Sequence, residues 1–230
     1  MNRTNFSSIL FDFDGTLTLM DGMDFLAELR GLEDELRAIN ATSRNTFSVT
    51  SERYKQRLEL LKPHRRQLEK LVEAYTKQLV PGAAQVCEHL HRLGKEMYII
   101  SGGIRNAIVP VGKQLRIPPE HIFGVELYFD STGRFGGYDT ASPLTGVHGK
   151  KKIIRDLAPA PPVAFIGDGT NDVSARDSVD RFIGYGGAEY RPPIEEVCDT
   201  YITDQDFTAI LPEILTETEL RLVQEHSIQH

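Results

Sequence analysis

Three short apolar runs, far apart in the chain, each end in a polar segment that contains glycine. They occupy residues 9–11, 98–100 and 163–166, and their composition is typical of buried strands. Helical patterns alternate with strand patterns from residue 83 onward, which favours a parallel sheet with helices on both faces. In an open sheet of this kind, ligands bind outside the carboxyl ends of the strands. The sequence therefore predicts an α/β fold, a Rossmann-like doubly wound parallel sheet, with functional residues at three strand ends.

The first of these strand ends carries two carboxylates. Asp12 and Asp14 follow residues 9–11 in the segment FDFDGT. Side chains two apart in an extended chain point the same way, and two carboxylates held that close repel each other unless one protonates or a cation lies between them. A hard metal ion with oxygen ligands is the simplest resolution. The alternative is a polar strand end whose aspartates begin a turn, and this segment alone leaves both open.

The other two strand ends carry further polar groups. The second ends in Ser101, Gly102 and Gly103, the third runs into GDGTND at residues 167–172, and three lysines occupy residues 150–152. Together these supply carboxylates, a hydroxyl with unhindered backbone amides, and a lysine, as a phosphoryl-transfer site requires. We expect Ser101, Gly102 and Gly103 to surround phosphoryl oxygens, because glycine allows close approach and a helix start gathers amide donors.

The order of these motifs resembles a known family. DFDGTLT, SGG, a lysine before a helix and GDGTND are similar to the haloacid dehalogenase superfamily of aspartate-nucleophile phosphatases. Residues 182–187, residues 201–204 and a hairpin segment at 127–139 resemble phosphoserine phosphatases within it. The resemblance covers about residues 6–215 and is weaker over residues 16–79. It implies a core of haloacid dehalogenase fold with a small helical-bundle cap inserted after the first motif.

The segment after the first motif changes to an almost purely helical pattern. Helical periodicity predicts four helices, at residues 23–30, 32–40, 51–61 and 65–77. A helical block inserted directly after the first strand end would lie over that end and close the site against water. We therefore expect a catalytic core of residues 1–15 and 80–230 and a cap, or lid, domain of residues 16–79.

The aspartates receive distinct roles. We assign Asp12 as the nucleophile, since a carboxylate can attack phosphorus and form an aspartyl-phosphate, and it stands at the first aspartate of the family motif. Asp14 would protonate the leaving alkoxide and then activate water. Asp168 would complete a Mg²⁺ site with Asp12 and the backbone carbonyl of Asp14, because Mg²⁺ prefers oxygen ligands.

Three further residues of these motifs have expected roles. Lys150 would balance charge on the phosphoryl group in the transition state. Lys151 and Lys152 compete for that role, and Lys150 is chosen because it matches the lysine of the family. Asp172 would lie outside the metal ligands and orient Lys150 or a metal-bound water, and Asn171 could donate to a phosphate oxygen.

The substrate is predicted from the cap. In phosphoserine phosphatases a cap glutamate receives the substrate ammonium and a cap arginine receives its carboxylate. These positions fall on Asp21, which is one methylene shorter, and on Arg57, which suits bidentate carboxylate recognition. Where that family has apolar cap residues, this chain has Arg44 and Thr50, so the pocket is more polar.

Three functions are weighed on these grounds. The first is hydrolysis of O-phospho-L-serine. The second is the same chemistry on another small phosphomonoester, such as phosphohomoserine, and a larger or more anionic substrate would suit the polar pocket. The third is an inactive fold kept as a binding module, against which the intact set of Asp12, Asp14, Ser101, Lys150 and Asp168 argues.

The composition of the chain limits the classes of partner and the compartment that we expect for this protein. The chain has 230 residues and a net charge of −7, which argues against a nucleic-acid partner. Its two cysteines are typical of free thiols in a reducing compartment. No signal-peptide segment or apolar run of membrane-spanning length is present in the sequence. We therefore expect a cytoplasmic monomer or homodimer that acts on a small phosphorylated metabolite, with no nucleic acid or membrane partner.

Overall fold

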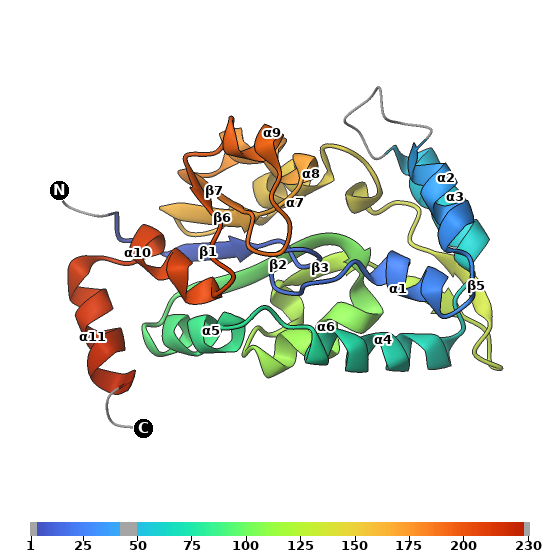
Figure 1. Ribbon diagram of the computed structural model, residues 1–230, viewed down its shortest axis with the longest axis horizontal. Helices are drawn as coiled ribbons and strands as arrows, with labels where there is room; N and C mark the ends of the chain where they lie inside the picture. The colour runs from blue at the N-terminus through green and yellow to red at the C-terminus, as the bar shows by residue number, and fades with distance from the viewer. Residues whose placement is uncertain (1–3, 42–49, 228–230) are drawn as a thin grey trace.

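A six-stranded parallel sheet forms the centre of the computed structural model, which describes residues 4–41 and 50–227 (Figure 1). The strand order is β3-β2-β1-β6-β7-β8, and every neighbouring pair is parallel. The strands are β1 (Ser8–Phe11), β2 (Glu96–Ile104), β3 (Ile122–Val125), β6 (Val163–Gly167), β7 (Arg181–Tyr185) and β8 (Thr200–Ile202). This order confirms the predicted doubly wound α/β fold.

The two central strands are β1 and β6, and all of their residues are buried. Strands covered on both faces read as continuous apolar runs, which is why both were recognisable in the sequence. Phe11 lies opposite Ile99 of β2 on one side and opposite Ile166 of β6 on the other. This register brings the ends of β1, β2 and β6 to one edge of the sheet, although they are far apart in the chain.

Helices cover both faces of the sheet, with α5 and α6 on one side and α7 and α8 on the other (Figure 1). Helix α5 (Ala83–Arg92) immediately precedes β2, and the helices after β2 are α6 (Arg105–Gln114), α7 (Gly149–Leu157), α8 (Thr170–Val173), α9 (Pro192–Glu195), α10 (Leu211–Ile214) and α11 (Glu217–Ser227). None of the helices in the described part of the chain has the length and apolar character needed to cross a membrane.

Four helices are inserted between β1 and α5: α1 (Gly22–Glu28), α2 (Glu33–Ala41), α3 (Ser51–Leu61) and α4 (Arg65–Lys77). Their bounds agree with the predicted ranges to within two residues. The Thr50 side chain caps α3 by accepting a hydrogen bond from the amide of Arg53. Helices α1, α2 and α3 lie at the end of the molecule opposite both termini (Figure 1).

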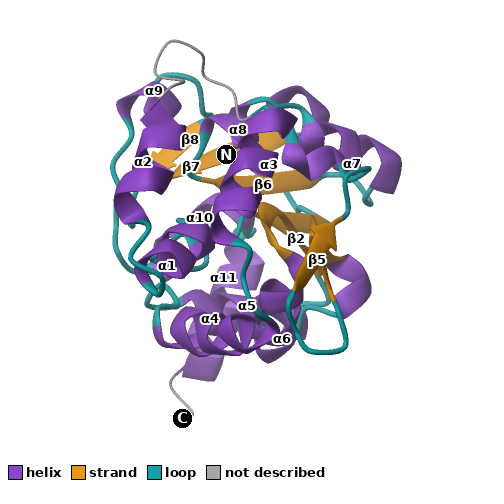
Figure 2. Ribbon diagram, turned by 90° about the vertical axis from the view of Figure 1, so that its right-hand side faces the viewer, coloured by secondary structure: helices purple, strands orange, loops and turns teal. Residues whose placement is uncertain are grey.

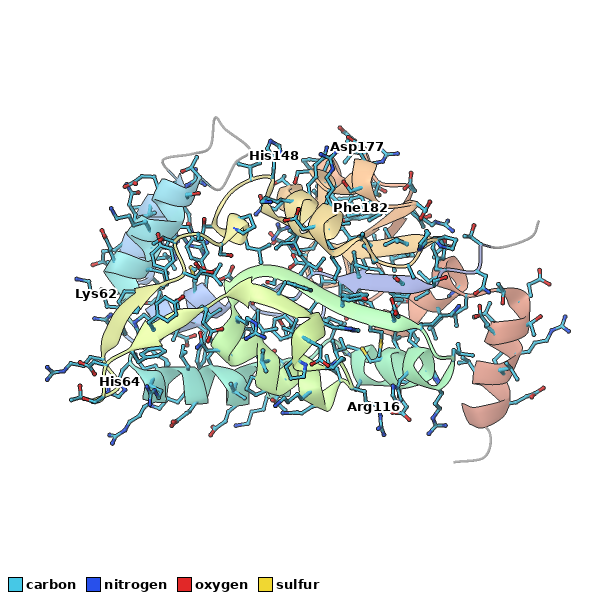
Figure 3. All side chains as sticks on the ribbon, turned by 180° about the vertical axis from the view of Figure 1, so that it is seen from behind. Lys62, His64, Arg116, His148, Asp177 and Phe182 are labelled. Carbon is cyan, nitrogen blue, oxygen red and sulfur yellow. The ribbon has the colours of Figure 1, made fainter. Side chains whose placement is uncertain are left out.

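A β-hairpin that follows β3 packs against these helices. Strands β4 (Leu127–Phe129) and β5 (Phe135–Tyr138) are antiparallel, as the sequence predicted. The carbonyl of Gly133 in the turn accepts a hydrogen bond from the Arg65 amide at 2.9 Å, and the ring of Tyr138 lies 5.8 Å from that of Tyr54 on α3. Figure 3 shows Lys62 and His64, between α3 and α4, at this end of the molecule.

One predicted boundary is wrong. The strand predicted at residues 98–100 extends through Ile104, so residues 101–103 belong to β2 and the following helix begins at Arg105. The strand continues because Ile104 is buried and pairs with Val125 of β3 after a shift in register. Ser101, Gly102 and Gly103 therefore do not stand at a helix start, and that argument for free amide donors fails.

Candidate active site

A cavity of about 470 Å³ lies at the carboxyl ends of the strands, with α1 and α3 contributing its other wall. Strand ends and inserted helices thus face one shared cavity. Every site residue expected from the sequence lines it: Asp12, Asp14, Asp21, Arg57, Ser101, Gly102, Gly103, Lys150, Asp168, Asn171 and Asp172.

Three buried aspartates meet at the base of this cavity. Asp12 follows β1, Asp168 follows β6 and Asp172 lies in α8, and carboxylate oxygens of the three lie within 4.8 Å of one another. Burial, with the nearby Asp12 charge adding to it, raises the pKa of Asp168 to about 7, against the opposing effect of Arg191 and Lys150. Burial and Asp12 likewise raise the pKa of Asp172 well above its usual range. So much negative charge in so little space favours a bound cation.

Lys150 supplies positive charge beside this cluster. Its ammonium lies 2.7 Å from Oδ1 of Asp12 and 2.5 Å from Oδ1 of Asp172, and its side chain is 5% exposed. Burial acts to lower the pKa of Lys150, but the two carboxylates outweigh it and the net shift is upward. Lys150 is therefore held charged between the two aspartates.

The neighbouring lysines face elsewhere. Lys151 pairs with Asp177 at 3.6 Å, and Lys152 pairs with the exposed Asp156 on its own helix at 2.8 Å. Neither lines the cavity. Figure 3 shows Asp177 on the outer side of the molecule, and His148, which precedes α7, is exposed there as well. The geometry thus favours Lys150 among the three lysines.

Asp14 has a different environment from Asp12. Its Oδ1 accepts a hydrogen bond from the Tyr75 hydroxyl at 2.6 Å and one from the Gly22 amide at 3.1 Å. Burial, followed by the charges of Asp21 and Asp12, raises the pKa of Asp14 well above its usual range, against the effect of these hydrogen bonds. Its carboxyl group is thus outside the cluster of three and favours the neutral form.

The end of β2 forms another side of the cavity. The Oγ of Ser101 accepts a hydrogen bond from the Gly103 amide at 3.0 Å, so that amide already has a partner. Ser101 is 1% exposed, whereas Gly102 is half-buried. On the facing side, Oδ1 of Asn171 is buried and has no hydrogen-bond partner among the described residues.

Asp21 and Arg57 lie together on the wall formed by the inserted helices. Oδ1 of Asp21 accepts hydrogen bonds from the amides of Met23 and Asp24, which caps α1, and lies 3.6 Å from the Arg57 guanidinium. The Arg57 side chain is 13% exposed, and its Nε is buried without a hydrogen-bond partner in the described part of the chain. Arg44, the other polar cap residue singled out from the sequence, lies outside the described residues.

The sequence patterns missed three residues of this site. Arg191 lines the cavity, and its guanidinium lies 3.3 Å from Oδ2 of Asp168. The Thr16 hydroxyl donates to Oδ1 of Asp168 at 3.3 Å. Tyr75 occupies the apolar face of α4, where periodicity indicates a core residue. Of these three residues, only Thr16 belongs to a motif that the sequence analysis recognised, as the last residue of the segment FDFDGT.

Comparison with known proteins agrees with this geometry. A family model described as haloacid dehalogenase-like hydrolase matches residues 9–176. The chain belongs to this hydrolase family. Among curated relatives, the human phosphoserine phosphatase is 30% identical over 210 residues, covering 90% of this chain and 92% of that protein. The chloroplastic phosphoserine phosphatase of Arabidopsis thaliana is 32% identical over 200 residues, covering 85% and 68%.

A solved structure of the same fold supports the architecture. A phosphoserine phosphohydrolase-like protein from Francisella tularensis superposes with a TM-score of 0.78 at 23% identity, covering 89% of this chain and 99% of that one. The α/β core described above is therefore the fold of this hydrolase family, and both curated relatives named above are phosphoserine phosphatases.

Proposed function

We propose that this protein is a Mg²⁺-dependent phosphomonoester hydrolase that works through an aspartyl-phosphate and acts on O-phospho-L-serine. The observation that carries the proposal is the convergence of Asp12, Lys150 and Asp168 at the base of one cavity. Family membership and the phosphoserine phosphatase relatives support it.

Asp12 has the environment of a nucleophile. Its Oδ1 accepts hydrogen bonds from the Phe13 amide at 2.7 Å and from Lys150 at 2.7 Å. These contacts fix the rotamer of the carboxylate, and Oδ2 remains to attack phosphorus, which splits one hydrolysis into two easier steps. Lys150 balances the charge that remains on the phosphoryl oxygens. Asp14, whose raised pKa favours the neutral form, donates the proton to the leaving alkoxide.

The donor set fits a magnesium ion. Asp12 and Asp168 offer oxygen atoms, the ligands that Mg²⁺ prefers. Burial and then the Asp12 charge raise the pKa of Asp168, and a bound cation would offset both effects. We propose these two carboxylates and the backbone carbonyl of Asp14 as ligands. Asp172 remains outside this set, because its Oδ1 meets Lys150 and its Oδ2 accepts from the Gly169 amide at 2.9 Å. A bound Mg²⁺ would neutralise charge on the phosphoryl group.

The opposite wall would recognise the rest of the substrate. Arg57 would receive the serine carboxylate and Asp21 its ammonium, and their pairing across 3.6 Å matches two such groups on one carbon. Asn171 and Ser101 would bind phosphoryl oxygens, with the Gly102 amide. We further propose that residues 16–79 act as a cap over a core of residues 1–15 and 80–230, since α1 and α3 supply this wall.

A second candidate keeps the chemistry and changes the substrate. The Asp21 carboxylate is short and already accepts two amides at the start of α1. A substrate with a longer side chain, such as phosphohomoserine, would bring its ammonium closer to Asp21 than phosphoserine does.

A hydrolysis screen tests both candidates. We expect the protein with Mg²⁺ to release phosphate from O-phospho-L-serine faster than from phosphohomoserine, phosphoethanolamine or sugar phosphates. Asp12→Asn should abolish turnover while the thermal unfolding midpoint stays within a few degrees. Faster turnover of phosphohomoserine would favour the second candidate, and substantial activity in Asp12→Asn would remove the nucleophile from the proposal.

A further inference from the structure

The hydroxyl of Tyr75 reaches the site from the inserted helices. Tyr75 lies on α4 and is fully buried, and its Oη donates to Oδ1 of Asp14 at 2.6 Å. The ring of Phe13 packs edge-on against the Tyr75 ring, with centroids 4.8 Å apart at 88°. Because the ring is enclosed on this side, the hydroxyl is aimed at Asp14 by packing as well as by the hydrogen bond.

The two oxygens of Asp14 have distinct surroundings. Oδ1 also accepts a hydrogen bond from the amide of Gly22, the first residue of α1. Oδ2 faces the end of β2, where a Cβ placed on Gly103 would lie only 2.6 Å from it. One oxygen is therefore held by the inserted helices, and the other is directed towards the strand end that lines the cavity.

This arrangement determines which oxygen carries a proton. A neutral carboxyl group has one oxygen that accepts and one O–H that donates. A backbone N–H can only donate, so the oxygen that it contacts is the acceptor. Because Oδ1 accepts from the amide of Gly22, the proton that Asp14 delivers as the acid of the proposed reaction belongs on Oδ2, beside Gly103.

We infer that Tyr75 is a positioning residue, which holds Asp14 through Oδ1 so that the proton on Oδ2 faces the leaving group. The inference rests on the proposed function and deepens it. In the first step the ester P–O bond breaks as the bond from Asp12 to phosphorus forms, and the Oδ2 proton passes to the leaving alkoxide. Both donors that orient Asp14 come from α1 and α4, so the acid depends on these two helices being in place (Figure 2).

Gly22 is matched to Tyr75. A Cβ at residue 22 would collide with the Tyr75 hydroxyl. The chain therefore has the one residue at the start of α1 that admits this hydroxyl and also donates its amide to the same oxygen.

The test separates proton delivery from general damage to the site. Departure of an alkoxide needs a proton, whereas p-nitrophenolate is a stable anion and leaves without one. For Tyr75→Phe we expect kcat/KM for O-phospho-L-serine to fall about tenfold or more, and kcat/KM for p-nitrophenyl phosphate to change less than about twofold. An equal fall for both esters, or no fall for either, would overturn the inference.

Controls keep this test independent of folding and of the exact substrate. Tyr185→Phe removes another buried hydroxyl, which lies outside the cavity and donates to the Gln205 carbonyl. This variant should leave unchanged the ratio of kcat/KM for O-phospho-L-serine to kcat/KM for p-nitrophenyl phosphate. If Tyr75→Phe fails to fold, Gly22→Ala displaces the same hydroxyl and should lower the same ratio. If the wild type prefers another alkyl phosphate, phosphoserine fails as the substrate and the ratio measured with that ester still decides the role of Tyr75.

Discussion

The ammonium nitrogen of Lys150 lies 2.5 Å from Oδ1 of Asp172, and these side chains are 5% and 0% exposed. Helix α7, which carries Lys150, also carries an exposed lysine–aspartate pair. Lys152 lies 2.8 Å from Asp156, and these side chains are 62% and 61% exposed. The two pairs share residue types and nearly share distances, and they differ in burial. They therefore allow a direct comparison of what the buried pair contributes.

Removal of the buried partner should be costly. Asp172→Ala leaves the ammonium of Lys150 with Asp12 as its remaining carboxylate, and loss of one member of a buried pair typically costs about 3–5 kcal/mol. We expect the free energy of unfolding to fall by roughly that amount and kcat to fall with it, since Lys150 loses its orientation. Urea unfolding followed by circular dichroism measures the first effect.

The exposed pair is the control. Asp156→Ala should reduce the unfolding free energy by about 1 kcal/mol or less, with kcat unchanged, because solvent screens that pair. Similar losses in both variants would contradict a special role for the contact between Lys150 and Asp172.

A second prediction concerns the metal. Mg²⁺ should raise the thermal unfolding midpoint of the wild type, because an ion that binds only the folded state stabilises it. Asp168→Asn removes a charged ligand and should abolish most of this shift, and chelation should stop turnover in the wild type. Asp177→Asn, at an exposed carboxylate, should retain the full shift. A wild-type midpoint that does not respond to Mg²⁺ would argue against the proposed ligands.

Much of the fold could be predicted because its signals are local. The runs that became β1 and β6 are apolar throughout, since both strands are covered on both faces. The bounds of α3 and α4 follow from periodicity and from the cap at Thr50. The end of β2 was harder, because its last residues are held by pairing with β3, and no local pattern records a partner strand.

The residues of the candidate site likewise divide into those with a local sequence signal and those placed by tertiary contacts. Asp12, Lys150 and Asp168 stand in recognisable motifs at strand ends or a helix start, and they converge as expected. Arg191 carries no motif, and its pairing with Asp168 depends on the loop after β7 folding back over the cavity. Tyr75 has the spacing of a core residue, and only the tertiary contact with Asp14 distinguishes it from one.

A third prediction tests substrate recognition by Arg57. Arg57→Ala should raise KM for O-phospho-L-serine about 10- to 100-fold, the equivalent of losing a charge-assisted hydrogen bond. Phosphoethanolamine has the same phosphate and ammonium groups without the carboxylate, so its KM should change little. Steady-state kinetics on both esters measure this difference.

Lys55→Ala supplies the matched control, because Lys55 is an exposed cation on the same helix. It should leave both KM values unchanged. If Arg57→Ala raised the two KM values equally, Arg57 would act on the phosphate or on the fold, and the carboxylate assignment would have to be abandoned.

The last prediction concerns the two cysteines, which are free thiols. Burial raises the pKa of the Cys87 thiol to about 12. The folded state thus holds this thiol protonated, and its contribution to stability, on the order of a few kcal/mol, is fully present below the ordinary thiol pKa of about 8.5. That contribution should be lost as the pH rises through about 12. The urea midpoint should therefore fall as the pH rises above about 9, and less steeply in Cys87→Ala.

The same burial predicts how the two thiols react. At pH 8, a thiol reagent should modify Cys198, which is partly exposed, well before Cys87, whose reaction should wait for unfolding. Equal reaction rates for the two thiols in the folded protein would contradict the burial on which this prediction depends.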